Sequence, residues 1–404
     1  MDLTSDYAHR RMVKLLTITL IAFMTAFGLL ANRYRPGRRE RFRFSKAYLA
    51  YALMWTIAFS LVYGRQIYKD YSQGQINLKD AITLYSYMNI TVAVINFVSQ
   101  MIISDHVAKM MSRVPFFKTL SALQLDSYSL YKSIALAMVK AIVFPLILEI
   151  AFIMQQRRQH PEMSLIWTVY RLFPLVISNL LNNCYFGAMV VVKVMLYALN
   201  TKLELQMQEV NLLQRKDQLK IYTRYYRMQR FCTFADELDM LAQIYMLIYV
   251  HSGKYLTPMS LSMILSLICH LLGITVGFYS LYCAVADTFI MGKPFDGLGS
   301  LINLVFLLIS LAEITLLTHL CNHLLVATRR SAVILQEMDL RHADCRFRQA
   351  VHDFTLLVTM TKFQIKPLGL YELDMTLISS VFTAVASFLL ILVQADLSQR
   401  FKMH

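Results

Sequence analysis

The C-terminal hydrophobic segment carries polar side chains among aliphatic ones. It reads Ser387-Phe388-Leu389-Leu390-Ile391-Leu392-Val393-Gln394-Ala395. A hydroxyl or an amide inside lipid is costly unless it faces protein or water. This stretch is therefore a candidate for an assembly interface or a water-filled path. The residues that we single out in it are Ser387, Leu390, Ile391, Gln394 and Ala395.

Ionisable residues inside other apolar segments form a second group, because a charge in lipid needs a partner or water. They are Lys140, Glu149, Arg171, Lys193 and Glu313. Glu149 and Arg171 fall at similar depth on consecutive antiparallel segments, so an ion pair between them is a hypothesis, either structural or ligand-fixing. Lys193 stands near the end of its segment, where its ammonium group is expected to reach the membrane surface.

Aromatic and polar side chains also recur in the outer halves of several segments. A small-molecule pocket is mostly apolar, with a few convergent polar groups. Aromatic residues also form the interface belt of any membrane protein, which is the alternative interpretation. The candidate pocket residues are Tyr87, Glu149, Trp167, Tyr170, Arg171, Phe278, Tyr282 and Asn303.

The search for catalytic chemistry finds one weak pattern. His319 and His323 stand one helical turn apart, with Cys321 between them, so both histidines share a helix face as a metal site requires. A membrane hydroxylase needs several such pairs, and interfacial polar residues at a helix end are the simpler interpretation. The sequence contains no Gly-rich phosphate loop and no GxSxG element. We therefore predict neither an enzyme nor a bound metal or cofactor.

The composition places all these residues in a lipid bilayer. The chain has 404 residues, of which 57% are hydrophobic and only 16% charged. The apolar residues fall in blocks long enough to cross a membrane. We predict an all-α integral membrane protein with seven transmembrane helices, at about 47–64, 82–103, 131–154, 164–199, 257–291, 297–328 and 375–394.

Loop charges predict the orientation. The net charge of +15 is explained by basic loops on the cytoplasmic side rather than by a nucleic-acid partner. The loops rich in Lys and Arg are 32–46, 104–130, 200–256 and 329–370. The positive-inside rule then puts the C-terminus outside.

Residues 12–31 leave two alternatives for the N-terminus. If they span the membrane, there are eight helices and the N-terminus is outside. If they lie on or within the inner face, there are seven and the N-terminus is inside, which Arg10, Arg11 and Lys14 favour.

Two long loops mix leucines with charges and are predicted to be helical. The 200–256 loop is interpreted as a helical extension of the fourth span. The 329–370 loop is either a helix lying on lipid or part of a packed core. We favour a shared intracellular bundle that anchors the membrane helices.

Two patterns near the C-terminus resemble the insect gustatory receptor family. The last span is similar to the family signature of Thr-Tyr, five hydrophobic residues and Gln-Phe. Ser387 and Phe388 replace Thr-Tyr, and Ala395 replaces the final Phe with a large loss of bulk. Upstream, Phe363-Gln364-Ile365-Lys366-Pro367-Leu368-Gly369-Leu370-Tyr371-Glu372-Leu373-Asp374 looks like the family's Phe, Gly and aromatic followed by Leu-Asp. The first two thirds of the chain resembles the family only in hydropathy.

The resemblance implies a ligand-gated, non-selective cation channel in the plasma membrane of sensory neurons. It implies a tetramer, homomeric or with related subunits, whose last helices line a central pore while the other spans hold a tastant. Ser387, Ile391 and Gln394 would then share a pore-facing stripe with Leu390 beside it. Aromatic and apolar residues outnumber polar ones in the outer halves, so we expect bitter or aversive ligands rather than sugars.

The predicted domains follow from these expectations. Residues 1–46 form a cytoplasmic segment with a membrane-associated helix, and 47–328 form a six-helix ligand-sensing domain. Residues 329–374 form a cytoplasmic anchor, 375–394 the pore-lining span and 395–404 a short extracellular tail.

Two other classes remain open. A G-protein-coupled chemoreceptor places its C-terminus inside, the reverse of what the loop charges predict, and no Asp-Arg-Tyr or Asn-Pro-x-x-Tyr element stands at the expected spans. A secondary transporter favours inverted repeats and spans broken by Gly or Pro. The chain has only 12 Gly and 8 Pro, and it shows no repeat.

Overall fold

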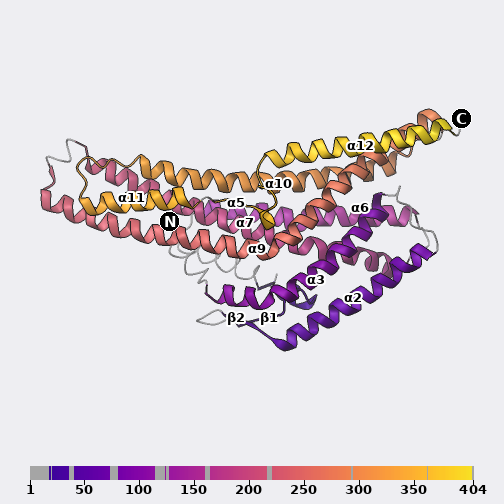
Figure 1. Ribbon diagram of the computed structural model, residues 1–404, viewed down its shortest axis with the longest axis horizontal. Helices are drawn as coiled ribbons and strands as arrows, with labels where there is room; N and C mark the ends of the chain where they lie inside the picture. Colours follow the sequence, from indigo (N-terminus) through magenta and orange to yellow (C-terminus); the bar gives the residue numbers. More distant parts are fainter. Residues whose placement is uncertain are drawn as a thin grey trace.

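The computed structural model describes residues 18–19, 21–35, 41–72, 81–113, 123, 127–159, 164–215, 221–292, 294–361 and 363–402. These residues are mostly helical, and most of the helices run along one long axis (Figure 1). In chain order the main elements are β1 (Asn32–Arg35), β2 (Arg41–Phe44), α2 (Lys46–Ser72), α3 (Ala81–Arg113), α5 (Ser127–Met138), α6 (Phe144–Gln159), α7 (Leu165–Leu213), α9 (Arg224–Met291), α10 (Gly297–Gln336), α11 (Cys345–Met360) and α12 (Thr376–Lys402).

Seven helices among the described residues are long and apolar enough to cross a membrane, which confirms the predicted seven-helix class. They are Lys46–Ser72, Tyr85–His106, Ala135–Arg158, Leu165–Leu213, Met259–Met291, Gly297–Gln336 and Thr376–Phe401. The described part of segment 12–31 adds no eighth candidate, because its helix stops before a turn at Gly28. Residues 12–17 and 20 lie outside the described residues. The orientation of both termini and the domain boundaries stay predictions.

Three of these helices belong to elements that exceed the roughly 20 residues needed to cross a bilayer by about twofold or more. The helices α7, α9 and α10 contain 49, 68 and 40 residues, so α9 is about 100 Å long at 1.5 Å per residue. The 200–256 loop was predicted to extend the fourth span, and this is only partly right. It divides between α7, which ends at Leu213, and α9, which continues unbroken into the fifth span. Thr223 begins α9 as an N-cap, because its hydroxyl accepts a hydrogen bond from Tyr226 N at 3.3 Å.

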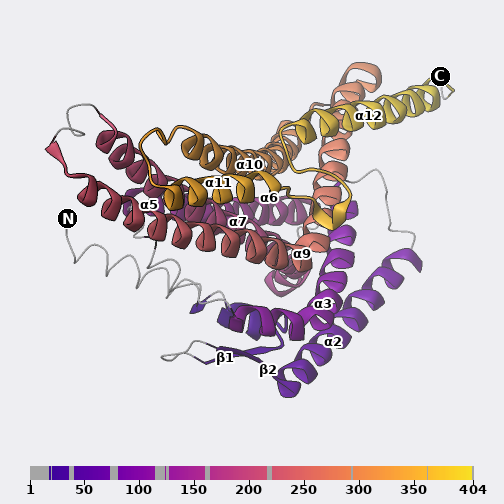
Figure 2. The same ribbon diagram turned by 60° about the vertical axis from the view of Figure 1, so that its left-hand side comes forward.

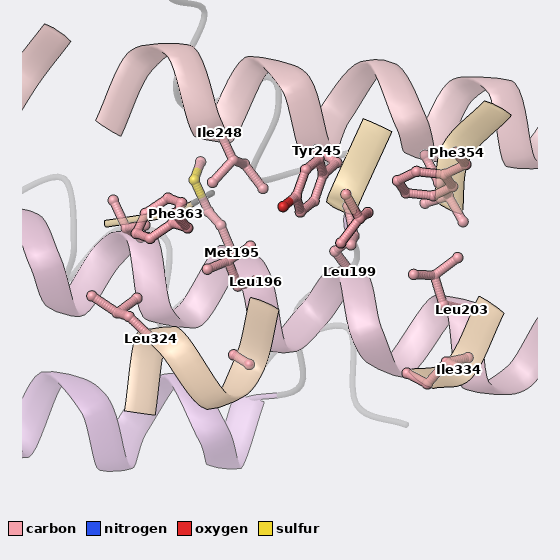
Figure 3. Close-up of a cluster of buried hydrophobic side chains, with 14 of the residues drawn as sticks. Met195, Leu196, Leu199, Leu203, Tyr245, Ile248, Leu324, Ile334, Phe354 and Phe363 are labelled. Carbon is pink, nitrogen blue, oxygen red and sulfur yellow. The ribbon is translucent and has the colours of Figure 1, made fainter. Parts of the chain in front are cut away.

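The projecting parts of α7, α9 and α10 pack with α11 as a helical bundle, as predicted. We call this the extension bundle, comprising residues 199–213, 224–258, 324–336 and 345–360. Figure 3 shows its buried core, in which side chains from all four helices point toward one another. Figure 2 shows α11 lying along α9 and α10. Asn200 adds a buried polar link from α7 to α10, since its Nδ2 donates to Ala327 O at 2.7 Å.

The segment between α11 and α12 connects this bundle to the last span. Phe363 and Leu373 are buried in the bundle's hydrophobic cluster, and Gly369 supplies a turn with φ of 73°. Burial raises the pKa of Tyr371 to about 12. Asp374 Oδ1 accepts a hydrogen bond from Thr376 N at 2.9 Å, at the first residue of α12. The Phe, Gly, aromatic and Leu-Asp pattern therefore supplies an anchor, a turn and a helix start.

Gly28 provides a test of how the N-terminal turn is held against the first span. Its φ is 71°, and a Cβ there would lie 2.9 Å from Trp55 Cβ. Gly292, which follows α9, has φ of 63° but open space around it. We expect Gly292→Ala to cost about 1–2 kcal/mol for the left-handed backbone alone. Gly28→Ala should cost about 1–3 kcal/mol more, because Trp55 must also move. Thermal unfolding midpoints of both variants in detergent measure this, and equal midpoints would contradict it.

Candidate functional site

The last helix is poorly covered within the chain. α12 is as apolar as any of the seven candidate spans, yet only 11% of its most apolar window is buried, against 22–61% for the other six. It lies at the edge of the array, beside α9 and α10 (Figure 1). Its buried side chains, Val385, Asp396 and Arg400, lie on one side of the helix. Most of its surface therefore faces away from the rest of the chain.

A polar stripe follows the opposite side of α12. Its exposed members recur every three, four or seven residues, which at about 100° per residue keeps them on one face. They are Thr376, Ser380, Thr383, Ser387, Gln394 and Ser398. Leu390 and Ile391, which are 59% and 61% exposed, interrupt the stripe at one level. Ala395 is also exposed, beside Gln394. All five residues singled out in this helix are thus exposed, and their place in a pore stays a prediction.

Contacts near its middle and near its end hold α12 to α9 and α10. Near its middle, Val385 packs in a cluster with Ile274 of α9 and Ile314 of α10. Near its end, Arg400 Nη1 lies 2.5 Å from Asp287 Oδ1 of α9, and Arg400 Nε lies 2.5 Å from Asp396 Oδ2. The helix is therefore fixed on one side by an apolar contact and an ionic contact.

A buried ion cluster joins α7, α9 and α10 to the segment between α5 and α6. Glu313 Oε2 on α10 lies 2.9 Å from Lys140 Nζ and 2.8 Å from His270 Nε2 of α9. Lys140 also donates to Asn183 Oδ1 of α7 at 3.1 Å. Lys140, His270 and Glu313 are 2%, 2% and 3% exposed. One carboxylate therefore links a lysine and a histidine from separate helices in a low-dielectric environment, where an unpaired charge is very costly.

The position of Lys140 depends on a local irregularity. It lies in a π-helical turn, Val139–Val143, between α5 and α6. Such turns are rare inside helices and often occur at functional sites. Lys140 and Glu313 are among the predicted intramembrane charges, but neither their pairing nor the contribution of His270 is predicted from the sequence. The sequence feature that could have indicated the cluster is that Lys140, His270 and Glu313 are all polar residues within apolar spans, where each needs a partner.

The ion cluster borders a small cavity that is lined by α7, α9, α10 and the π-helical turn. The cavity has a volume of about 10 Å³, room for about one water molecule. Its lining includes Lys140, Asn182, His270, Glu313 and Ile314. Ile314 belongs both to this lining and to the cluster that holds Val385. The ion cluster is therefore adjacent to the apolar contact between Val385 of α12 and Ile314 of α10.

Four of the predicted pocket residues lie together near the start of α7. Tyr170 stacks on Tyr63 of α2 with ring centroids 4.7 Å apart, and Trp167 contacts Tyr170 edge-on at 5.2 Å. Tyr87 OH donates to Asp70 Oδ2 at 2.8 Å. Tyr87 and Tyr170 pack on the same hydrophobic cluster, and Arg171 directly follows Tyr170 on α7.

Three other pocket candidates lie elsewhere, on α9 and α10. Phe278 packs beside the cluster that holds Val385, and Tyr282 stacks on Tyr279 with centroids 6.1 Å apart. Asn303 Nδ2 donates to Ser280 Oγ at 2.9 Å. The structure therefore divides seven of the eight candidates between two places, one at α2, α3 and α7 and one on α9 and α10. The eighth, Glu149, lies on α6.

The hypothesis of an ion pair between Glu149 and Arg171 is wrong. Arg171 Nη1 donates instead to Gln156 Oε1 at 2.9 Å, and no ion pair joins the two residues in the described structure. The reason is depth. Glu149 lies ten positions before the end of α6 at Gln159, whereas Arg171 lies six positions after the start of α7. Gln156, three positions before the end of α6, lies closer to the level of Arg171 than Glu149 does.

His319 and His323 meet as their spacing requires. Their Nε2 atoms are 3.0 Å apart, and Tyr197 OH lies 3.3 Å from His323 Nδ1. No group of three or more His, Cys, Asp or Glu side chains in the described part of the chain is placed to hold a metal ion.

The fold and this site define a multi-pass helical membrane protein whose last span is held on one side only. Its sequence matches the family described as 7tm chemosensory receptor over residues 18–399. It is 83% identical over its full length to the Drosophila melanogaster protein named "Putative gustatory receptor 94a", which is also covered completely. It is 36% identical to "Putative gustatory receptor 97a" of the same species, over 98% of this chain and 93% of that one. The chain therefore belongs to the insect gustatory receptors of the 7tm chemosensory receptor family.

Weaker similarities extend beyond these relatives. A stretch of 180 residues, 45% of this chain, is 23% identical to 41% of the D. melanogaster "Gustatory receptor for bitter taste 93a". The fold is similar to that of the insect olfactory receptor OR5 from Machilis hrabei, with a TM-score of 0.64 and 10% identity over 96% of this chain and 99% of that one. The structure of OR5 in complex with eugenol has a TM-score of 0.56 and 13% sequence identity to this chain. The match covers 96% of this chain and 100% of that one. These structures share the fold.

The ion cluster predicts a specific pattern of stabilities. Lys140→Met leaves the buried Glu313 carboxylate with His270 alone, and Glu313→Gln leaves the buried Lys140 ammonium group without a carboxylate. Each should cost about 3–5 kcal/mol of the free energy of unfolding. The Lys140→Met/Glu313→Gln double variant should cost clearly less than the two single losses together. Unfolding midpoints in detergent measure these losses. Lys132→Met, at an exposed lysine of α5, is the matched control and should change little. Additive losses would mean that the pair is not coupled.

Proposed function

We propose that this gustatory receptor is a ligand-gated cation channel in the plasma membrane of sensory neurons. In this proposal four subunits, identical or related, bring their α12 helices around a central pore. The observation that carries it is the polar stripe of α12, which lies on the face that one chain leaves uncovered. Hydroxyl and amide groups on that face would meet water in the pore instead of lipid, where they are costly.

The stripe also suggests how the pore closes and what it passes. Four Ile391 side chains, flanked by Leu390, would form an apolar constriction that closes by dewetting. Four Gln394 side chains would form an uncharged polar ring, which lets hydrated cations pass with little selectivity. Ser387 and Thr383 would continue the polar lining on the other side of the constriction. Thus the constriction and the polar ring lie within one helical turn of each other.

Gating requires that the ligand binds the open state better than the closed state. The buried ion cluster supports a route for that coupling. It ties Lys140 and Asn183 to Glu313 of α10, and Ile314 next to Glu313 packs where Val385 of α12 sits. A shift among the ligand-binding spans would therefore be passed to α12 through α10.

The ligand in this proposal is a small organic molecule of the bitter or aversive kind. The aromatic group around Tyr63, Trp167 and Tyr170 supports an apolar ligand more than a sugar, which needs many hydrogen-bonding partners. One partial relative is named for bitter taste, which agrees with this assignment.

A charge in the pore tests the role of α12. We expect Gln394→Arg to abolish or sharply lower ligand-evoked cation current while the protein still reaches the cell surface, because four guanidinium groups would repel cations. Gln399→Arg is the matched control: Gln399 is also exposed on α12 but lies about 140° around the helix. Its conductance should stay near wild type. The test is current recorded together with surface labelling. Unchanged conductance and selectivity in Gln394→Arg would count against a pore-lining stripe.

The predicted orientation separates this proposal from a G-protein-coupled receptor. An epitope after His404 should be labelled on intact cells, and an epitope before Met1 only after permeabilisation. Labelling of the N-terminal epitope alone on intact cells would reverse the topology and rule out the proposed arrangement.

A further inference from the structure

The hairpin before the first span gathers arginines on one face. β1 reads Asn-Arg-Tyr-Arg and β2 reads Arg-Phe-Arg-Phe, and the register pairs Arg33 with Arg43 and Arg35 with Arg41. Side chains alternate between the two faces of a strand, so the paired Arg33 and Arg43 lie on one face, which we call the arginine face. Asn32 occupies the other face and is buried, with its Nδ2 donating to Ser104 O of α3 at 3.0 Å.

This pairing is unfavourable for the hairpin by itself. Directly opposite residues of an antiparallel pair lie close together, and like charges there are destabilising. Arg33 and Arg43 are both exposed, and neither forms an ion pair within the described residues. Asp105, the carboxylate next to Ser104, is paired with Lys109 at 2.6 Å. Arg33 and Arg43 therefore place two like charges side by side with no carboxylate partner among the described residues.

The hairpin lies at the boundary of the membrane. β2 ends at Phe44, and the first candidate span begins at Lys46. The contact of Asn32 with Ser104 falls two residues before the end of the second candidate span at His106. Figure 1 shows β1 and β2 beside α3 and the start of α2, away from the C-terminal end of α12. That is the depth at which lipid headgroups meet water, on the side that the loop charges predict to be cytoplasmic.

We propose that the arginine face of this hairpin binds the phosphate groups of anionic phospholipids, and of phosphoinositides in particular. A guanidinium group donates two parallel hydrogen bonds to a phosphate. Two arginines held side by side by the strand register match a headgroup that carries several phosphates. Anionic lipids are concentrated in the cytoplasmic leaflet, where juxtamembrane basic residues bind them. The site does not depend on whether the protein conducts ions.

The test uses the full-length receptor purified in detergent and analysed by native mass spectrometry. The probe is phosphatidylinositol 4,5-bisphosphate, compared with phosphatidylcholine and with soluble inositol trisphosphate. We expect wild-type receptor to retain the bisphosphate lipid in preference to phosphatidylcholine. Soluble inositol trisphosphate should bind more weakly than the lipid, because the hairpin lies at headgroup depth.

Two variants separate lipid binding from folding. Arg43→Glu creates an opposite-charge pair with Arg33, which favours the hairpin while removing the anion site. Arg33→Gln/Arg43→Gln removes both charges without adding an acid. Each lost arginine should lower retention about fivefold, from the contribution of one basic residue at a charged surface. The unfolding midpoint of Arg43→Glu should equal or exceed that of wild type.

The matched control is Arg215→Gln/Arg224→Gln. Both arginines are exposed; Arg215 follows the end of α7, and Arg224 is the first residue of α9. This variant changes the net charge equally and should retain the lipid like wild type. Equal lipid loss in the control would show unspecific charge attraction and overturn the site. Full retention in Arg43→Glu or in Arg33→Gln/Arg43→Gln would overturn it as well.

Discussion

The membrane part of this receptor is organised around one buried carboxylate. Glu313 lies in an apolar span, where a lone charge cannot remain without a partner. Its partners come from other helices: Lys140 from the π-helical turn and His270 from α9. Lys140 in turn binds Asn183 of α7. Helices of equal hydrophobicity gain little from packing on one another rather than on lipid. A directional contact of this kind therefore helps to decide which helices are neighbours.

The same region shows a sharp change in packing. α7 is the most buried of the seven candidate spans, with 61% of its apolar window covered, whereas α12 has 11%. The ion cluster and the extension bundle fix α7, α9 and α10 to one another, while α12 makes most of its described contacts with α9 and α10 through a narrow face. Elements that move in gating are drawn from the parts of a protein with few buried contacts. The contrast thus agrees with the proposed role of α12 as the moving wall of a pore.

Much of this arrangement could be predicted from the sequence, since hydropathy alone fixes the existence of spans. The seven helices and the packed bundle follow from apolar blocks and from leucines spaced among charges. The partners of the buried charges do not follow. Similar depth in the membrane predicted an ion pair between Glu149 and Arg171. Gln156 lies closer than Glu149 to the connection between α6 and α7, and it is the partner of Arg171. Lys140 reached Glu313 through a π-helical turn, which hydrophobic periodicity does not reveal. The extension of α9 was assigned to α7 because an unbroken helix of 68 residues has no signal in hydropathy beyond its membrane part.

The segment from Phe363 to Asp374 explains why the two C-terminal patterns occur together. Leu373 and Phe363 are buried in the hydrophobic cluster of the extension bundle. Asp374 accepts a hydrogen bond from the backbone N–H of Thr376, the first residue of α12. One end of α12 is thus tied to the rigid bundle, while its other end is tied to α9 through Arg400 and Asp287. Between these ties, Val385 makes the apolar contact, on the side of α12 opposite to Ser387 and the polar stripe. A helix held at both ends and lightly in the middle can tilt or rotate without losing its attachment. The stripe between the ties would then change its exposure to water as the supporting helices shift.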